Sequence, residues 1–173
     1  MDSGVWMGLG IFAALFAFGW AYYTIKQNVK RNILFKNQYE QQKLLTHQNR
    51  IFITNTTVEQ VKRSLARHIH IDDSVKGAFV GGKYQITKQT DNYIEYKHTS
   101  SFMVGGDGDE FTASVSFNAT GSELRAVFGI NSWHEKDGVT RRAGIEAMRE
   151  LLKAVESAFK AVDLNVRIST VQK

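Results

Sequence analysis

The sequence predicts an α+β protein in which an antiparallel sheet packs on a long C-terminal helix, preceded by a single transmembrane helix. Three patterns predict this fold class. An uncharged apolar run fills residues 5–25, apolar and polar residues alternate through much of residues 83–135, and residues 139–162 carry apolar residues at helical spacing. We therefore expect a transmembrane anchor (1–25), a basic juxtamembrane helix or linker (26–49) and a soluble α+β domain (50–173).

The run from Val5 to Ile25 has the length of a membrane-spanning helix. Its 21 residues carry no charge, and at about 1.5 Å per residue they extend about 31 Å, close to the thickness of a bilayer core. A surface helix of a soluble domain has a polar face, which this run lacks. A cleaved signal peptide has basic residues before its apolar run, whereas here Asp2 precedes and the basic residues follow. We therefore expect an uncleaved, single-pass anchor.

The basic residues after the run predict its orientation. Lys and Arg are retained on the cytoplasmic side of a membrane span. We expect a cell-membrane protein with its N-terminus outside and its C-terminal domain in the cytoplasm. The residues expected at the membrane surface, close to anionic lipid headgroups, are Lys26, Lys30, Arg31 and Lys36.

Small residues form a ridge along the predicted span. Ala13, Ala17 and Ala21 recur every fourth residue, a spacing that lets two helices approach closely in lipid. The ridge predicts contact with other transmembrane helices. The alternative is that Ala is simply frequent in membrane helices.

Composition excludes several classes of protein. The chain has no Cys and no Pro, so it has no disulfide, thiolate nucleophile or cysteine zinc site. Residues 26–43 hold five basic residues and one acidic one, whereas residues 44–173 hold 17 basic and 15 acidic ones. Most of the net charge of +5 therefore gathers beside the predicted membrane span. A nucleic-acid-binding face would need that excess on the folded domain, so we expect no nucleic-acid partner.

The predicted domain begins with a strand and a helix. Residues 50–56, RIFITNT, are rich in β-branched and aromatic residues and predict a strand. Thr56 or Thr57 then caps a helix, which has Glu59 and Gln60 in its first turn. The apolar stripe of this helix comprises Val61, Leu65 and Ile69.

Antiparallel strands and a second helix follow. Residues 83–89 and 92–100 flank a turn at Thr90-Asp91 and predict a hairpin. Residues 110–119 and 123–135 alternate between apolar and polar residues, as strands with one packed and one wet face do. The segment 101–104 is a short strand or the end of the previous one. Residues 139–162 predict the long covering helix, and LNVRIST (164–170) predicts a short final strand.

The order strand, helix, antiparallel strands, long helix resembles the START-like, or helix-grip, fold. The segments that carry the resemblance are RIFITNTTVEQVKRSLARHI and GIEAMRELLKAVESAF, and it covers about residues 50–162. START-like domains hold lipids or other apolar molecules between sheet and helix; some are cyclases or hydrolases, and others are scaffolds. The resemblance implies a ligand-binding wall of Phe111, Val115, Phe117, Phe128, Ile130, Met148, Leu152 and Phe159. The same residues are those of an ordinary core.

Two functions are therefore open. As a membrane-tethered binding module for a lipid or other apolar ligand, the domain would have a hollow between Phe111, Phe117, Phe128 and Phe159. As a structural or assembly subunit of a membrane protein complex, it would have a filled core and an apolar patch outside. Catalysis would need polar groups converging inside the hollow.

No catalytic or cofactor motif is visible, so we have no reason to assign an enzyme and expect no cofactor or metal. The segment VGGDGDE (104–110) lacks the sequence patterns of dinucleotide-binding, Walker and calcium-binding loops. It predicts a mobile hairpin loop. HIHIDD (68–73) offers His68, His70 and Asp72, but no third strong ligand lies nearby. His98 and His134 are isolated on predicted strands and are expected at the surface.

Overall fold

The structure is a computed structural model, and it describes residues 3–29, 35–71, 83–99, 109–135 and 138–173. Within these ranges, the side chains of residues 3–11, 27 and 83 are not described. The predicted hairpin loop at 104–110 and the short strand at 101–104 lie largely outside the described residues, as do Lys30, Arg31 and Asp72.

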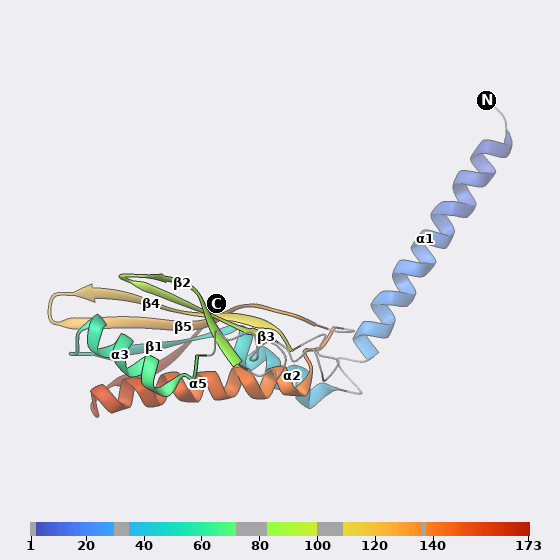
Figure 1. The fold of residues 1–173 in the computed structure, drawn as a ribbon. Coiled ribbons are helices and arrows are strands. Elements are labelled where there is room, and N and C mark those ends of the chain that lie inside the picture. The colour runs from blue at the N-terminus through green and yellow to red at the C-terminus, as the bar shows by residue number, and fades with distance from the viewer. Residues whose placement is uncertain (1–2, 30–34, 72–82, 100–108, 136–137) are drawn as a thin grey trace.

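The domain is built on one six-stranded sheet (Figure 1). The spatial order of its strands is β2-β3-β4-β5-β1-β6, and every neighbouring pair is antiparallel. The strands are β1 (Gln48–Thr54), β2 (Lys83–Thr90), β3 (Tyr93–Thr99), β4 (Phe111–Thr120), β5 (Glu123–Trp133) and β6 (Arg167–Gln172). The helices are α1 (Ser3–Val29), α2 (Lys36–Thr46), α3 (Val58–His68) and α5 (Arg142–Val162). The predicted α+β class, with an antiparallel sheet and a long C-terminal helix, is confirmed.

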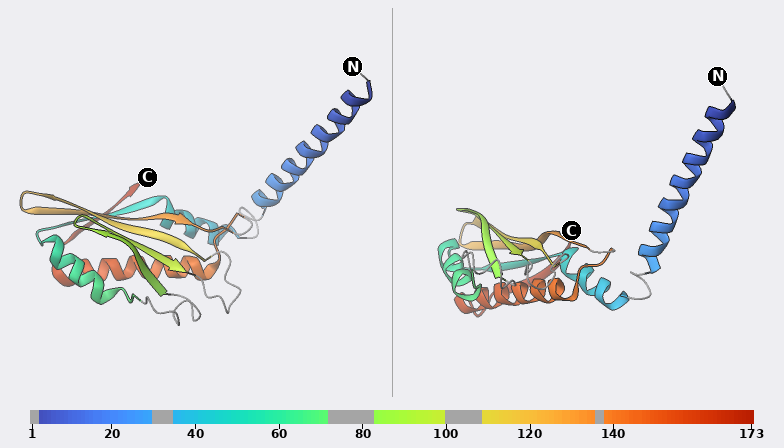
Figure 2. Two further views of the ribbon diagram at one scale, coloured as in Figure 1. Left: turned by 45° about the horizontal axis from the view of Figure 1, so that its top comes forward. Right: turned by 45° about the vertical axis from the view of Figure 1, so that its right-hand side comes forward.

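Helices α3 and α5 lie on the same face of the sheet (Figures 1 and 2). Strand β4 alternates strictly between buried and half-buried residues from Phe111 to Phe117, so its buried side chains all face the helices. Thr57 caps α3: its side chain accepts from the Gln60 backbone N–H, and the Gln60 side chain accepts in return. The predicted alternation and one of the two predicted caps are therefore confirmed.

Helix α5 begins three residues later than predicted, at Arg142 rather than Val139. Val139 and Thr140 are buried ahead of the helix. The Thr140 backbone N–H donates to Gln42 Oε1 at 2.8 Å, and this bond ties the segment ahead of the helix to α2.

Helix α2 packs on the domain through glutamines. Gln42 is 2% exposed, and besides accepting from Thr140 it donates to Glu135 Oε1 at 2.5 Å. Gln38 Nε2 donates to the Thr140 carbonyl at 2.5 Å. A buried amide bonded at both ends fixes the orientation of a helix, since either unpaired end would cost desolvation energy. Residues 36–46, which fall in the predicted linker, thus form part of the packed structure.

Helix α1 stands apart from the sheet and its covering helices (Figure 2). Its Ala13, Ala17 and Ala21 are exposed, and so is Lys26. Within the part of the chain that the structure describes, no helix is both long enough and apolar enough to cross a membrane.

Candidate functional site: the interior between the sheet and helix α5

The structure brings the eight predicted wall residues together between the sheet and α5. Seven belong to one buried core cluster and are at most 5% exposed, whereas Leu152 is half-buried and packs against that cluster. Three come from β4, two from β5 and three from α5, because strand alternation and the helical stripe aim them at the same layer.

One end of this interior is closed by stacked aromatic rings. The rings of Phe52 on β1 and Phe159 on α5 lie parallel, with centroids 4.2 Å apart and planes 8° apart. Both side chains are fully buried, as are Val61 and Leu65 of α3. Our sequence-based list omitted Phe52, although its place in the RIFIT strand carried the signal.

The other end of the interior is aromatic and polar. Strand register places Tyr84 opposite His98, His98 opposite Phe111, and Phe111 opposite Trp133, so these four form one row across the sheet. The His98 and Phe111 rings stack with centroids 5.0 Å apart, and the Tyr84 ring is tilted 5.5 Å from His98. The next row inward contains Ala113 opposite Tyr96 and Ile130.

His98 is a buried member of this row, so the prediction that it lies at the surface is wrong. It is 2% exposed, and its Nδ1 lies 3.1 Å from the Asp109 carbonyl oxygen. A carbonyl only accepts, so Nδ1 carries the proton of this bond. Burial lowers the pKa of His98, against the opposing pull of the Asp109 hydrogen bond and the charges of Asp109, Glu110 and Glu150. His134 is exposed, as predicted.

Tyr84 ties the polar end to α5. Its hydroxyl donates to the Ala147 carbonyl at 2.8 Å. Burial, and then the charge of Glu150, raise the pKa of Tyr84 well above its usual range. The hydroxyl is therefore a neutral donor at physiological pH.

Asp109 sits beside the first turn of α5. A Cβ added to Gly144 would lie 2.8 Å from Asp109 Cα and 2.9 Å from Thr140 Cγ2, so only glycine allows this approach. Asp109 Oδ1 is buried and has no hydrogen-bond partner among the described residues. A buried polar atom without a partner is uncommon in folded proteins and calls for a specific reason.

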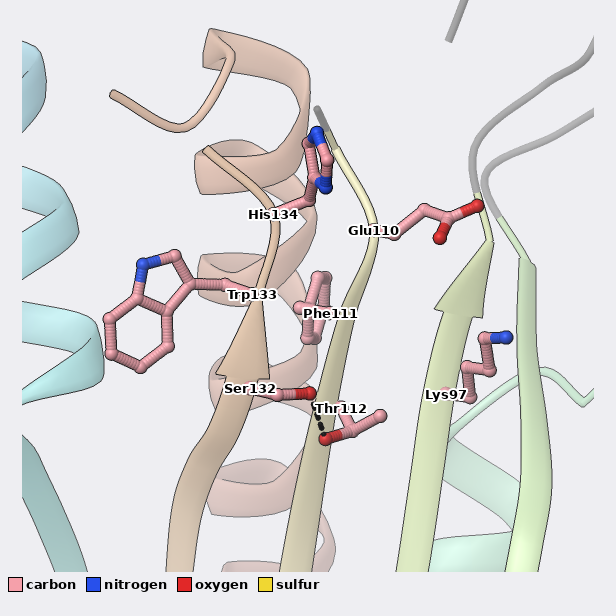
Figure 3. A pocket seen from close by; sticks show the side chains of 7 residues that line it. All are labelled: Lys97, Glu110, Phe111, Thr112, Ser132, Trp133 and His134. Atoms are coloured by element: carbon pink, nitrogen blue, oxygen red, sulfur yellow. Dashed lines mark hydrogen bonds between the residues drawn. The ribbon is translucent and has the colours of Figure 1, made fainter. Parts of the chain in front are cut away.

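A separate hollow of about 350 Å³ opens at the ends of β3, β4 and β5 (Figure 3). Thr112 and Ser132 lie side by side in its lining on neighbouring strands, with their hydroxyl oxygens 2.7 Å apart. Its lining is Lys97, Glu110, Phe111, Thr112, Ser132, Trp133 and His134. Of the eight predicted wall residues, Phe111 alone lines this hollow. In the ranges that the structure describes, no three His, Cys, Asp or Glu side chains gather as a metal site.

Two further surface hollows are lined by described residues. One lies between α3 and the end of α5 and is basic, with Arg63, Arg67 and His68 in its lining. The other lies between α2 and β6 and includes Leu44, which is 59% exposed.

No protein-family model matches the chain, and no curated protein matches it. Among solved structures, the chain is similar to the crystal structure of TTHA0849 from Thermus thermophilus, with 13% sequence identity and a TM-score of 0.31. The similarity covers 67% of this chain and 99% of that one. A similarity at this level says nothing about function.

Proposed function

We propose that this chain is a single-pass membrane-anchored protein whose cytoplasmic α+β domain binds a lipid or another apolar ligand between the sheet and α5. The observation that carries the proposal is the gradient along this interior. The end at Phe52 and Phe159 is apolar and closed, whereas the end at His98 and Asp109 is polar and holds an acceptor that no described residue pairs. An amphiphile has the same division into an apolar tail and a polar head.

The position of the ligand follows from the same gradient. The ring stack leaves no room beside Phe159, so the tail belongs further along the interior, near Ala113 and Met148. Ala113 is fully buried and is the smallest residue in its row, between Tyr96 and Ile130. The head then lies at the row of Tyr84 and His98.

The proposed membrane anchor is based on the sequence. The uncharged run 5–25 and the basic residues after it favour a span with the N-terminus outside. Lys26 and Lys36 flank the segment that joins α1 to α2. Since α2 is bonded to the domain through Gln42, an anchored α1 would hold the ligand-binding interior close to the membrane that supplies the ligand.

Native mass spectrometry of the detergent-extracted, full-length chain tests the binding function. We expect one copurified apolar molecule per chain, lost in Ala113→Leu, because the added branch fills the proposed tail position. Ala119→Leu, an exposed change on the same strand, is the matched control and should keep the ligand. A cooperatively folded wild-type chain that carries no apolar molecule would contradict the proposal.

Cysteine labelling tests the orientation, since the natural chain has no cysteine. Gln172→Cys should resist a membrane-impermeant maleimide on intact cells and react after lysis. Ser3→Cys should react on intact cells. The reverse pattern would place the domain outside.

A structural role in a membrane protein complex is the second candidate, and one surface feature favours it. Leu44 of α2 and Val171 of β6 are 59% and 49% exposed, and Leu44 lines the hollow between these two elements. Stable partner subunits in the same mass spectrum, with no bound ligand, would support this function instead.

A further inference from the structure

We infer that Asp109 is the recognition point for a positively charged amine headgroup, so that the ligand is an alkylammonium amphiphile rather than a fatty acid. This inference rests on the proposed function and adds the chemical class of the ligand. It is carried by a buried carboxylate oxygen that the fold holds in place and to which no described residue donates.

The fold fixes Asp109 from two sides. Its carbonyl oxygen accepts from His98 Nδ1, and its Cα and Cβ pack against the position where Gly144 lacks a side chain. These contacts hold the backbone and Cβ of Asp109 in place. Its Oδ1 is nevertheless buried, with no bond to the described part of the chain, and a donor supplied by a ligand would remove the cost of that burial.

The donors of Tyr84 and His98 are already used. The Tyr84 hydroxyl donates to the Ala147 carbonyl, and the Nδ1–H of His98 donates to the Asp109 backbone rather than to its side chain. The polar end thus has an acceptor to satisfy, and we expect the missing donor to come with the ligand. A carboxylate headgroup brings no donor, whereas an ammonium brings three.

The charges near the polar end also favour a cationic headgroup over an anionic one. Glu110 follows Asp109 in the chain, and the charges of both, together with Glu150 of α5, act on His98. All three groups are acidic, but Glu110 and Glu150 are exposed to solvent, whereas Asp109 is half-buried. A cationic head therefore gains most from Asp109, and an anionic head is repelled most by it.

The rest of the ligand meets apolar surface. Phe111 follows Asp109 by two residues, and Ala113, two residues further, lies on the same face of β4 as Phe111. Both are buried, and Met148 of α5 belongs to the same core cluster. An alkyl tail that starts at Asp109 would follow this line into the interior.

Equilibrium dialysis of the full-length chain in phosphatidylcholine nanodiscs tests the inference, with empty nanodiscs as the blank. The three probes are octylamine, octanol and octanoate, which share one tail and differ in the head. We expect wild-type protein to bind octylamine at least about tenfold more tightly than octanoate. Asp109→Asn should reduce this preference to about twofold while leaving octanol binding unchanged, because the tail contacts remain.

Glu110→Gln is the matched control, because it removes the same charge one residue away from an exposed side chain. It should keep most of the preference for octylamine. A wild-type preference that is absent, or that Glu110→Gln and Asp109→Asn reduce equally, would overturn the inference and leave the proposed function standing. Failure of all three probes to bind would instead count against the proposed function itself.

Discussion

The two ends of the sheet–helix interior both contain stacked aromatic rings but differ in polarity. At one end, Phe52 and Phe159 stack 4.2 Å apart with no exposed surface. At the other, His98 stacks on Phe111 at 5.0 Å beside a carboxylate oxygen that no described residue pairs. The first end satisfies every packing requirement of a stable core, whereas the second keeps a buried polar atom that lowers stability. Proteins retain such costs where function needs them.

The largest expected effect comes from breaking the closed end. Phe159→Ala removes one ring of the stack from a fully buried site and should lower the free energy of unfolding by about 3–5 kcal/mol. Phe111→Ala deletes an equally large ring at the polar end and should cost less, about 2–3 kcal/mol, if the neighbouring side chains can relax into a site that admits a ligand, as we propose.

Urea unfolding of both variants in detergent, followed by tryptophan fluorescence, measures this difference. Phe159→Leu is the conservative control and should cost less than Phe159→Ala. Equal losses for the two alanine variants would mean that the two ends are packed alike.

A smaller effect should follow from crowding Asp109. Gly144→Ala places a Cβ 2.8 Å from Asp109 Cα, so the β4 entry or the first turn of α5 has to move. The overlap should cost about 1–3 kcal/mol, partly offset by about 1 kcal/mol from better helix propensity. We expect a net loss of up to about 2 kcal/mol in urea unfolding.

The exposed neighbour Ala143 supplies the control for this change. Ala143→Gly reports helix propensity alone and should cost about 1 kcal/mol. If Gly144→Ala stabilised the protein as ordinary propensity predicts, Asp109 would not be held against α5.

The closed end was more predictable from sequence than the polar end, and the reason is the range of the interactions. Alternation within β4 and β5 and the stripe of α5 are local patterns, and they identified Phe117, Phe128 and Phe159 directly. In NYIEYKHTS, the same alternation of faces along the strand puts His98 on the side of Ile94 and Tyr96. Its burial could therefore have been predicted, but a histidine in a strand is usually at the surface.

Asp109 and Gln42 could not have been identified in this way. Asp109 owes its position to a glycine that follows it by 35 residues in the sequence. The bond between Gln42 and the Thr140 backbone joins residues 98 apart. No periodicity within a strand or helix reports such pairings, because they depend on how complete elements pack.

The smallest expected effect is a pH dependence that belongs to the polar end alone. Burial lowers the pKa of His98 in the folded chain, whereas the unfolded chain has the usual value near 6.5. Above that value both states are neutral at this residue and the stabilisation is complete.

As the pH falls below about 6.5, the unfolded chain takes up the proton first, so stability is lost by at most about 1.4 kcal/mol per pH unit. We expect the urea midpoint of wild-type protein to fall between about pH 7.5 and 5.5, by an amount equivalent to at most about 1.4 kcal/mol. His98→Gln should remove that part of the fall, whereas His134→Gln, at an exposed site, should leave it intact. Equal pH dependence in wild-type protein and His98→Gln would mean that the buried imidazole does not distinguish the two ends.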